Sequence, residues 1–163
     1  MDEPASQQQL RRVAFSYELI GPGWAKARLS DGVNQIEMFP SHLSDALGDL
    51  TWAVVALMNG ALEQSCEWAD EPGEWRWILV RDGDQLDVTI LGFKETFSRL
   101  GNERGLLLFQ SCCNLRQFAI QVNNQLWNLV REHGFDGYAK LWHNRFPEER
   151  WHMLGELIRK RNP

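Results

Sequence analysis

The sequence is poor in the residues that most often build metal and thiol centres, with three cysteines and four histidines among 163 residues. An odd number of cysteines, two of them adjacent at Cys112 and Cys113, does not make a disulfide framework. The histidines have no metal-ligand spacing, and no Cys-x-x-Cys pair occurs. The sequence therefore predicts no metal or cofactor, and it predicts a reducing compartment such as the cytoplasm.

Long apolar runs are also missing. The longest lies within Leu50–Met58, which is far too short to cross a bilayer. The chain starts with the acidic Met1-Asp2-Glu3-Pro4, whereas a secretory signal needs a basic start followed by an apolar run. These features predict a cytoplasmic protein that does not enter membranes.

Positive charge is in deficit, because 17 basic residues stand against 22 acidic ones and the net charge is −5. Nucleic acids and anionic membrane surfaces are bound by clustered lysine and arginine, so neither is the expected partner. The short basic run Arg159-Lys160-Arg161 suits the negative end of a helix.

Sequence motifs of common reaction centres are absent as well. No Gly-x-Gly-x-x-Gly or Walker pattern is present to hold phosphates, and no Gly-x-Ser-x-Gly nucleophile turn occurs. Cys112 and Cys113 precede a predicted helix start at Asn114, where a thiolate is favoured. Adjacent cysteines at a strand end are nevertheless more often small buried apolar residues. Both interpretations of this pair stay open.

What the chain does contain is regular alternation of apolar and polar residues. Alternation over 13–19, 24–30 and 33–39 predicts three strands, with turns at Gly21-Pro22-Gly23 and Asp31-Gly32. Three further strands are predicted over 66–70, 74–81 and 86–93, and 105–112 is a candidate for a seventh.

Helical spacing marks the remaining segments. One apolar stripe follows Pro40-Ser41 and predicts a helix capped by Ser41 or Ser44; its members are Leu43, Leu47, Leu50, Val54, Leu57 and Ala61. The last third predicts a helix from Asn114 to Gly134, a short helix around Tyr138–Trp142 and a third helix from Pro147.

The predicted order is β-β-β-α-β-β-β-(β)-α-α-α. It indicates an α+β fold, with one mainly antiparallel sheet of six to seven strands and helices packed against it. We expect a flexible segment over 1–12 and a single domain over 13–163.

The acidic segment Glu63–Asp87 stands out, because it contains eight acidic residues and two basic ones. We interpret it as a hairpin around Glu71-Pro72-Gly73 whose carboxylates steer a basic partner and whose tryptophans anchor it. The predicted partner-binding residues are Glu67, Trp68, Asp70, Glu71, Glu74, Asp82 and Asp84. The alternative is a solvated edge that prevents strand-to-strand aggregation.

Three runs of sequence resemble a family of small uncharacterised bacterial α+β proteins. They are residues 17–27 (YELIGPGWAKA), 41–50 (SHLSDALGDL) and 71–77 (EPGEWRW), and the resemblance extends over about 13–150. In size, acidity and element order the chain is also similar to immunity proteins of bacterial toxin systems, including contact-dependent growth inhibition. That similarity implies a cytoplasmic antitoxin that binds and blocks a toxin domain, and it transfers no binding residues.

The sequence thus favours a non-enzymatic binding protein whose partner is a cognate toxin domain with a basic surface. The first alternative is a small-molecule-binding or thiol-dependent enzyme domain that uses Cys112, Cys113 or a tryptophan-lined pocket. The second is a module that self-associates through an edge strand.

Overall fold

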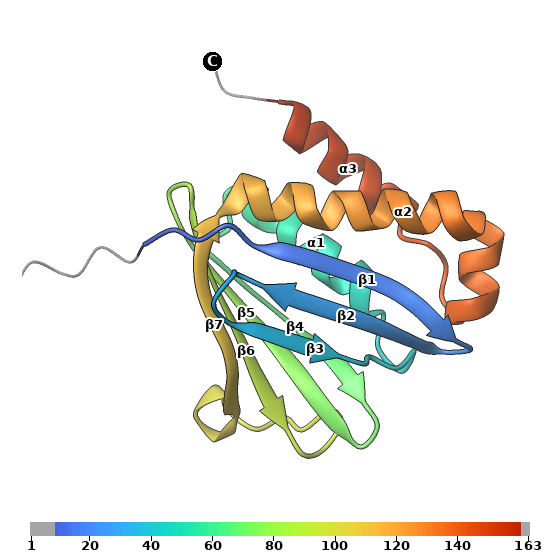
Figure 1. Cartoon of the computed structure of the whole chain (residues 1–163), viewed down its shortest axis with the longest axis horizontal. Helices are drawn as coiled ribbons and strands as arrows, with labels where there is room; N and C mark the ends of the chain where they lie inside the picture. The colour runs from blue at the N-terminus through green and yellow to red at the C-terminus, as the bar shows by residue number, and fades with distance from the viewer. Residues whose placement is uncertain (1–8, 161–163) are drawn as a thin grey trace, which may run out of the picture.

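The computed structural model describes residues 9–160, and within them it has two antiparallel sheets and three helices (Figure 1). The first sheet contains β1 (Ala14–Gly21), β2 (Trp24–Ser30) and β3 (Gln35–Met38). The second contains β4 (Glu63–Asp70), β5 (Gly73–Asp82), β6 (Gln85–Phe93) and β7 (Leu106–Asn114). The helices are α1 (Ala46–Met58), α2 (Leu115–Trp142) and α3 (Glu148–Arg159), and a short 3₁₀ turn spans Asn102–Arg104.

The α+β class is confirmed, but the expectation of one sheet of six to seven strands is wrong. The strands form a sheet of three, in the order β1-β2-β3, and a sheet of four, in the order β4-β5-β6-β7. Helix α1 follows β3 and packs on β4, so the chain leaves the first sheet before it begins the second. Alternation reports which face of a strand is buried and does not report which strands are neighbours.

The core lies between the two sheets and includes buried residues of all three helices. Phe15 on β1 meets Trp77 on β5 edge to face, with 6.1 Å between the ring centroids. Tyr17 on the same strand meets Trp68 on β4 at 5.9 Å. From α2, Phe118 approaches Trp77 at 6.4 Å. Aromatic pairs of this kind add roughly 0.5–1.5 kcal/mol each beyond the area that they bury. They hold the two sheets and α2 together.

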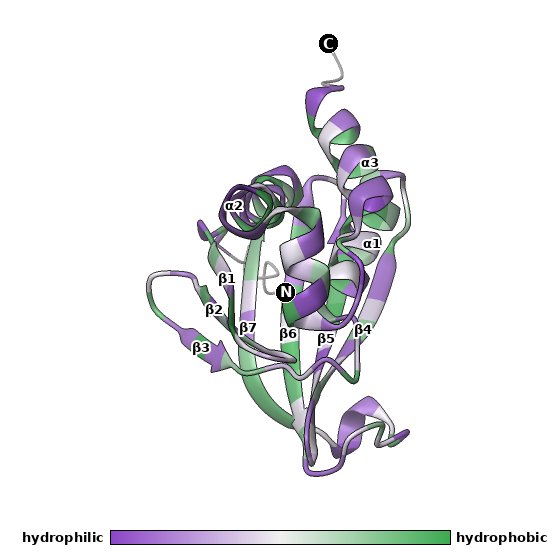
Figure 2. Ribbon diagram, turned by 90° about the vertical axis from the view of Figure 1, so that its right-hand side faces the viewer, coloured by the Kyte–Doolittle hydropathy of each residue, from purple (hydrophilic) through white to green (hydrophobic). Residues whose placement is uncertain are grey.

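Helix α2 lies along the free edge of β1, and Figure 2 shows it beside that strand in a view nearly along the helix. Three glutamines spaced four residues apart accept hydrogen bonds from alternate main-chain N–H groups of β1 and of the residue just before it. The pairs are Gln117 with Val13 (3.1 Å), Gln121 with Phe15 (3.3 Å) and Gln125 with Tyr17 (3.1 Å). Four helical residues rise about 6 Å and two strand residues advance about 6.8 Å, so the two spacings nearly match. This glutamine ladder satisfies an edge that would otherwise be unpaired.

Asp31, in the turn after β2, connects the two sheets. It accepts a hydrogen bond from the Ser111 hydroxyl at 2.7 Å and others from the N–H groups of Val33 and Asn34. Burial alone raises the pKa of this carboxyl, but the hydrogen bonds, together with Arg11 nearby, lower the pKa below its usual value overall. The ionised form of Asp31 therefore stabilises the folded state.

Helix boundaries differ from the predicted ones where side chains form tertiary contacts. Helix α1 begins at Ala46 and not near Ser41; Leu43 lies before it and is exposed, and Asp45 is the N-cap. The Ser44 hydroxyl accepts the N–H of Ala69 on β4 at 2.9 Å, so this serine connects to the sheet and does not cap the helix.

The C-terminal helices follow the sequence more closely. Asn114 caps α2 as predicted, accepting the N–H of Gln117 at 3.0 Å. Gly134 has a φ of 68° and kinks the helix, which then continues to Trp142. The third helix begins directly after Pro147, as predicted.

The predicted flexible segment 1–12 falls largely outside the described residues, as do residues 161–163 of the predicted domain. Within the described part, the Arg11 N–H donates to the Cys112 carbonyl at 2.8 Å. Among residues 9–160, no helix has the length and apolar character that crossing a membrane requires.

Candidate functional site

The acidic segment is divided between two ends of the second sheet. Strands β4 and β5 pair from Asp70 with Gly73 at one end to Glu63 with Val80 at the other. Glu71 therefore lies at one end of the sheet and Asp82 at the opposite end. The ten residues of β5 separate these ends by roughly 30 Å. The segment is not one continuous acidic surface.

The predicted partner-binding residues also differ in exposure. Four are exposed, Asp70 is half-buried and two are buried; the exposed four are Glu67, Glu71, Asp82 and Asp84. Trp68 has no exposed surface and lies in the core, where its ring centroid is 5.0 Å from that of Trp77. Glu74 is 3% exposed. The partner-binding role of the seven residues stays a prediction.

Glu74 is buried in an ion pair with Arg76, which is 5% exposed. An oxygen of Glu74 lies 3.1 Å from Nη2 of Arg76. The other terminal nitrogen of Arg76 donates to the Leu100 carbonyl at 2.6 Å and to Oδ1 of Asn102 at 3.0 Å. The guanidinium also lies over the Phe93 ring, 4.1 Å from its centroid. The pair thus attaches the loop 94–105 to the sheet.

Two further hydrogen bonds hold the first part of this loop. The second oxygen of Glu74 accepts the Ser98 N–H at 3.2 Å, and the Thr96 hydroxyl donates to the Gly73 carbonyl at 2.9 Å. Between these anchors Phe97 has a φ of 55° and its side chain is 54% exposed. A left-handed conformation is unusual for a residue with a side chain. The loop therefore presents an aromatic ring to solvent from a well-anchored position.

A groove with a volume of about 530 Å³ lies between α1, the free edge of β4 and this loop, and we call it the edge groove. It is lined by Leu43, Ser44, Asp45, Asp49, Trp52, Ala53, Gln64, Ser65, Cys66, Glu67 and Phe97. Three of these side chains are carboxylates and none is basic. Trp52 on α1 and Phe97 on the loop are both about half exposed, at 48% and 54%. Acidic and aromatic surface therefore meet at this groove.

The carboxylates on α1 are partly desolvated. Burial raises the pKa of Asp45. Burial, together with the nearby charge of Asp45, raises the pKa of Asp49. Arg150 of α3 lies 3.7 Å from Asp49 and 5.5 Å from the Trp52 ring centroid, and it offsets part of this charge. A cation from a partner would improve the environment of both acids.

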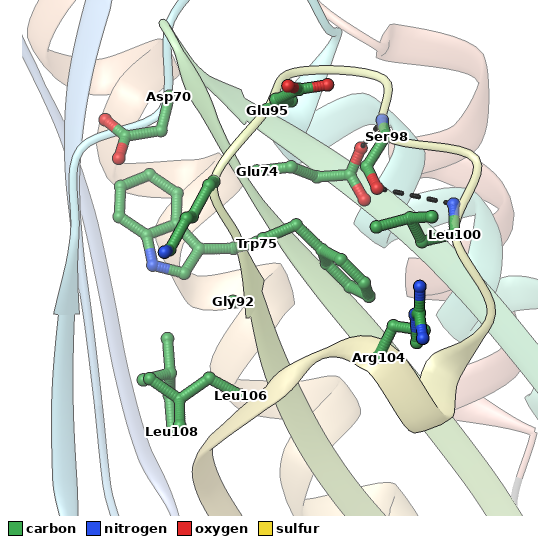
Figure 3. A pocket seen from close by; sticks show the side chains of 12 residues that line it. Asp70, Glu74, Trp75, Gly92, Glu95, Ser98, Leu100, Arg104, Leu106 and Leu108 are labelled. Atoms are coloured by element: carbon green, nitrogen blue, oxygen red, sulfur yellow. Dashed lines mark hydrogen bonds between the residues drawn. The ribbon is translucent and has the colours of Figure 1, made fainter.

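A second cavity, which we call the tip pocket, lies at the β4–β5 turn and has a volume of about 580 Å³ (Figure 3). In Figure 3 the Trp75 indole lies between Asp70 on one side and Leu106 and Leu108 on the other. Leu108 is the extra residue of a bulge in β7, since Ile90 pairs with Phe109 but Leu91 pairs with Leu107. The apolar part of the lining comes from Trp75, Phe93, Leu100, Leu106 and Leu108.

The cysteines are poor candidates for a reactive centre. Cys112 and Cys113 are buried, and burial raises their pKa values to about 11 and about 12. Burial likewise raises the pKa of Cys66. A thiolate is the reactive form, so these environments disfavour nucleophilic chemistry at neutral pH. Residues 9–160 contain no group of three or more His, Cys, Asp or Glu side chains placed to hold a metal ion.

The residues of the edge groove on α1 were missed by the sequence reasoning, which considered only the apolar stripe of that helix. Asp45, Asp49 and Trp52 are spaced by four and three residues, so they share the helix face opposite the stripe. That spacing is visible in the sequence. Phe97 and Glu67 join them only in the folded chain.

Comparisons of this chain with protein-family models, with curated proteins and with solved structures find no match. The resemblance to small bacterial proteins and to immunity proteins therefore stays a prediction. The assignment of the candidate site rests on the geometry of the edge groove.

Proposed function

We propose that this chain is a non-enzymatic binding protein that engages a protein partner at the edge groove. The observation that carries the proposal is the meeting of Asp45, Asp49 and Glu67 with the exposed rings of Trp52 and Phe97 around one groove. Glu67 lies 3.7 Å from Nε of Arg76, but its side chain stays 47% exposed and can still face a partner. Elsewhere in the acidic segment the carboxylates lie apart or, like Glu74, are buried in an ion pair.

Charge and aromatic surface have separate roles in such a complex. Carboxylates that face solvent raise the rate at which a basic partner is encountered. Aromatic side chains that become buried supply much of the affinity. The raised pKa of Asp49 fits a site that is completed by a partner, because an arriving lysine or arginine replaces lost solvation. The matching partner is therefore a basic protein surface.

The specific form of the proposal is a cytoplasmic immunity protein that neutralises a bacterial toxin domain by direct binding. It is supported by the general similarity to such proteins in size and acidity. A nuclease toxin suits the groove well, because its substrate cleft must be basic to bind phosphate. An acidic protein that covers the cleft would block the substrate.

The test is co-expression with the C-terminal domain of the proposed toxin, taken as the product of the neighbouring gene, followed by size exclusion and titration calorimetry. We expect a stable complex at micromolar concentration. Trp52→Ala should weaken it at least tenfold, and Trp127→Ala should leave it unchanged. Trp127 is a matched control, because it is 50% exposed on α2 and does not line the groove. No complex, or equal effects of the two substitutions, would contradict the proposal.

A second candidate function is the binding of a small apolar molecule in the tip pocket. The lining by Trp75, Phe93 and three leucines favours it. Trp75→Ala should then abolish the saturable binding of an apolar fluorescent probe, and unchanged binding would count against it. A thiol-dependent reaction is disfavoured by the burial of the cysteines.

A further inference from the structure

Strand β7 forms an edge of the second sheet and contains no charged residue. Its sequence is LLLFQSCCN, from Leu106 to Asn114. The first three leucines are exposed, at 68%, 55% and 38% for Leu106, Leu107 and Leu108. Figure 2 colours this part of the strand as hydrophobic. A long, apolar and uncharged edge is a template for pairing with another strand.

The other edges formed by residues 9–160 are protected. The edge of β1 is bonded to the glutamine ladder of α2. Strand β3 is only four residues long. The edge strand β4 carries the exposed carboxylates of Glu63 and Glu67, which discourage strand addition. Over its first half, strand β7 carries no charge and is not bonded along its free side by any segment of residues 9–160; its one irregularity there is the bulge at Leu108.

Some main-chain N–H and C=O groups of β7 point away from β6, toward the free side of the strand. The Cys112 carbonyl accepts the Arg11 N–H at 2.8 Å, so the polar groups of Cys112 point away from β6. Because these directions alternate along a strand, the groups of Gln110 point the same way. Among residues 9–160, no main-chain group bonds to Gln110 on that side. Gln110 itself is exposed.

We propose that β7 pairs antiparallel with β7 of a second copy of this chain over residues 106–110. The pairing would join two four-stranded sheets into one. A second copy fits because identical uncharged stretches meet without repulsion, although the whole chain is acidic. The flanks do not oppose the pairing by a block of like charge. Arg104 precedes the stretch, and after it Cys112 lies between Asp87 on β6 and Arg11 on the free side, which is itself paired with Asp31.

The tip pocket adds a place for apolar side chains. Leu106 and Leu108 line its β7 side, so a strand added at this edge lies beside the pocket opening (Figure 3). The interface is small compared with the roughly 800 Å² per partner of a typical stable complex. We therefore expect a dissociation constant on the order of 10 μM. The interface lies at the edge opposite β4, so it leaves the edge groove free and does not depend on the proposed function.

The experiment is sedimentation equilibrium of the full chain from about 1 to about 200 μM, a range that brackets the expected dissociation constant. The average mass should rise from monomer toward dimer. Leu107→Lys places a charge on the exposed edge and should keep the protein monomeric. Leu62→Lys makes the same change at a leucine that is 71% exposed outside the strand, and should leave dimerisation unchanged.

Amide hydrogen exchange of the unmodified protein provides a second measurement. The Gln110 amide should exchange more slowly as concentration rises, because its N–H becomes paired. A protein that stays monomeric throughout, a dimer that Leu107→Lys does not weaken, or a Gln110 amide insensitive to concentration would each overturn the proposal.

Discussion

Replacing Arg76 by methionine should destabilise the protein severely, because the methionine side chain retains the aliphatic stem but leaves Glu74 buried and unpaired. Glu74 is 3% exposed, and its partner guanidinium lies 3.1 Å away. Breaking a buried ion pair from one side costs about 3–5 kcal/mol of unfolding free energy. The variant also loses the hydrogen bonds to Leu100 and Asn102 and the contact with Phe93. We therefore expect a loss of unfolding free energy within this range and not below it.

The assay is urea denaturation followed by tryptophan fluorescence. With a slope on the order of 2 kcal/mol per molar urea, a loss of about 4 kcal/mol lowers the midpoint by about 2 M. Trypsin provides a local readout, because the loop that Arg76 anchors contains the exposed Lys94, Arg99 and Arg104. Cleavage within the loop should accelerate in the variant. Arg131→Met, at an exposed position on α2, should change stability by less than about 0.5 kcal/mol.

A double-mutant cycle separates the ion pair from general damage. Glu74→Gln removes the charge but retains an oxygen that can accept the Ser98 N–H. The double variant, which also carries Arg76→Met, should lose about 1–3 kcal/mol less unfolding free energy than the sum of the losses in the two single variants. Strict additivity, or a cost below about 1 kcal/mol for Arg76→Met alone, would refute the reasoning.

Three further predictions concern the fold. Gln121→Leu leaves the Phe15 N–H unpaired and should cost about 1–3 kcal/mol, whereas Gln121→Glu keeps the acceptor oxygen and should cost clearly less in the same urea titration. Asp31→Asn should cost about 1–2 kcal/mol at pH 7. Because the folded pKa of Asp31 is lowered, that difference should shrink as pH falls below about 4, and a difference that grows toward acid would contradict the assignment. Cys112 and Cys113 should react with a thiol reagent more slowly than free cysteine in the native protein and at the normal rate in denaturant; rapid native reaction would revive the thiol-enzyme alternative.

Local structure was largely predictable because apolar residues recur with a different period in strands and in helices, and that period is visible in the sequence. Trp24–Ser30 has the same bounds in the prediction and in the structure, and Asn114 caps α2 as its position indicated. The start of α1 was missed, since Leu43 continues the apolar spacing but lies outside the helix. The Ser44 hydroxyl bonds to β4 instead of capping α1, and no local signal announces that contact.

Sheet composition and the candidate site depend on contacts between distant residues, so the sequence predicted them only in part. Glu71 and Asp82 are close in sequence, but the length of strand β5 lies between them, so they are at opposite ends of the sheet. The side chain of Trp68 is on the face of β4 that packs in the core, so it is buried. Conversely, Glu67, Trp52 and Phe97 come from three different elements and meet only after folding. Only the common helix face of Asp49 and Trp52 on α1 could have been predicted from the sequence, from their spacing of three residues.

The most direct test of the edge groove compares two double charge reversals for their effect on binding of the proposed toxin partner. Asp49→Lys with Glu67→Lys reverses charge in the groove, and Asp82→Lys with Asp84→Lys makes the same change at the far end of the sheet. Both raise the net charge equally. We predict that the groove variant binds at least about 100-fold more weakly, with a reduced salt dependence, and that the far-end variant changes affinity less than about threefold. Equal losses, or a larger loss for the far-end variant, would contradict the account.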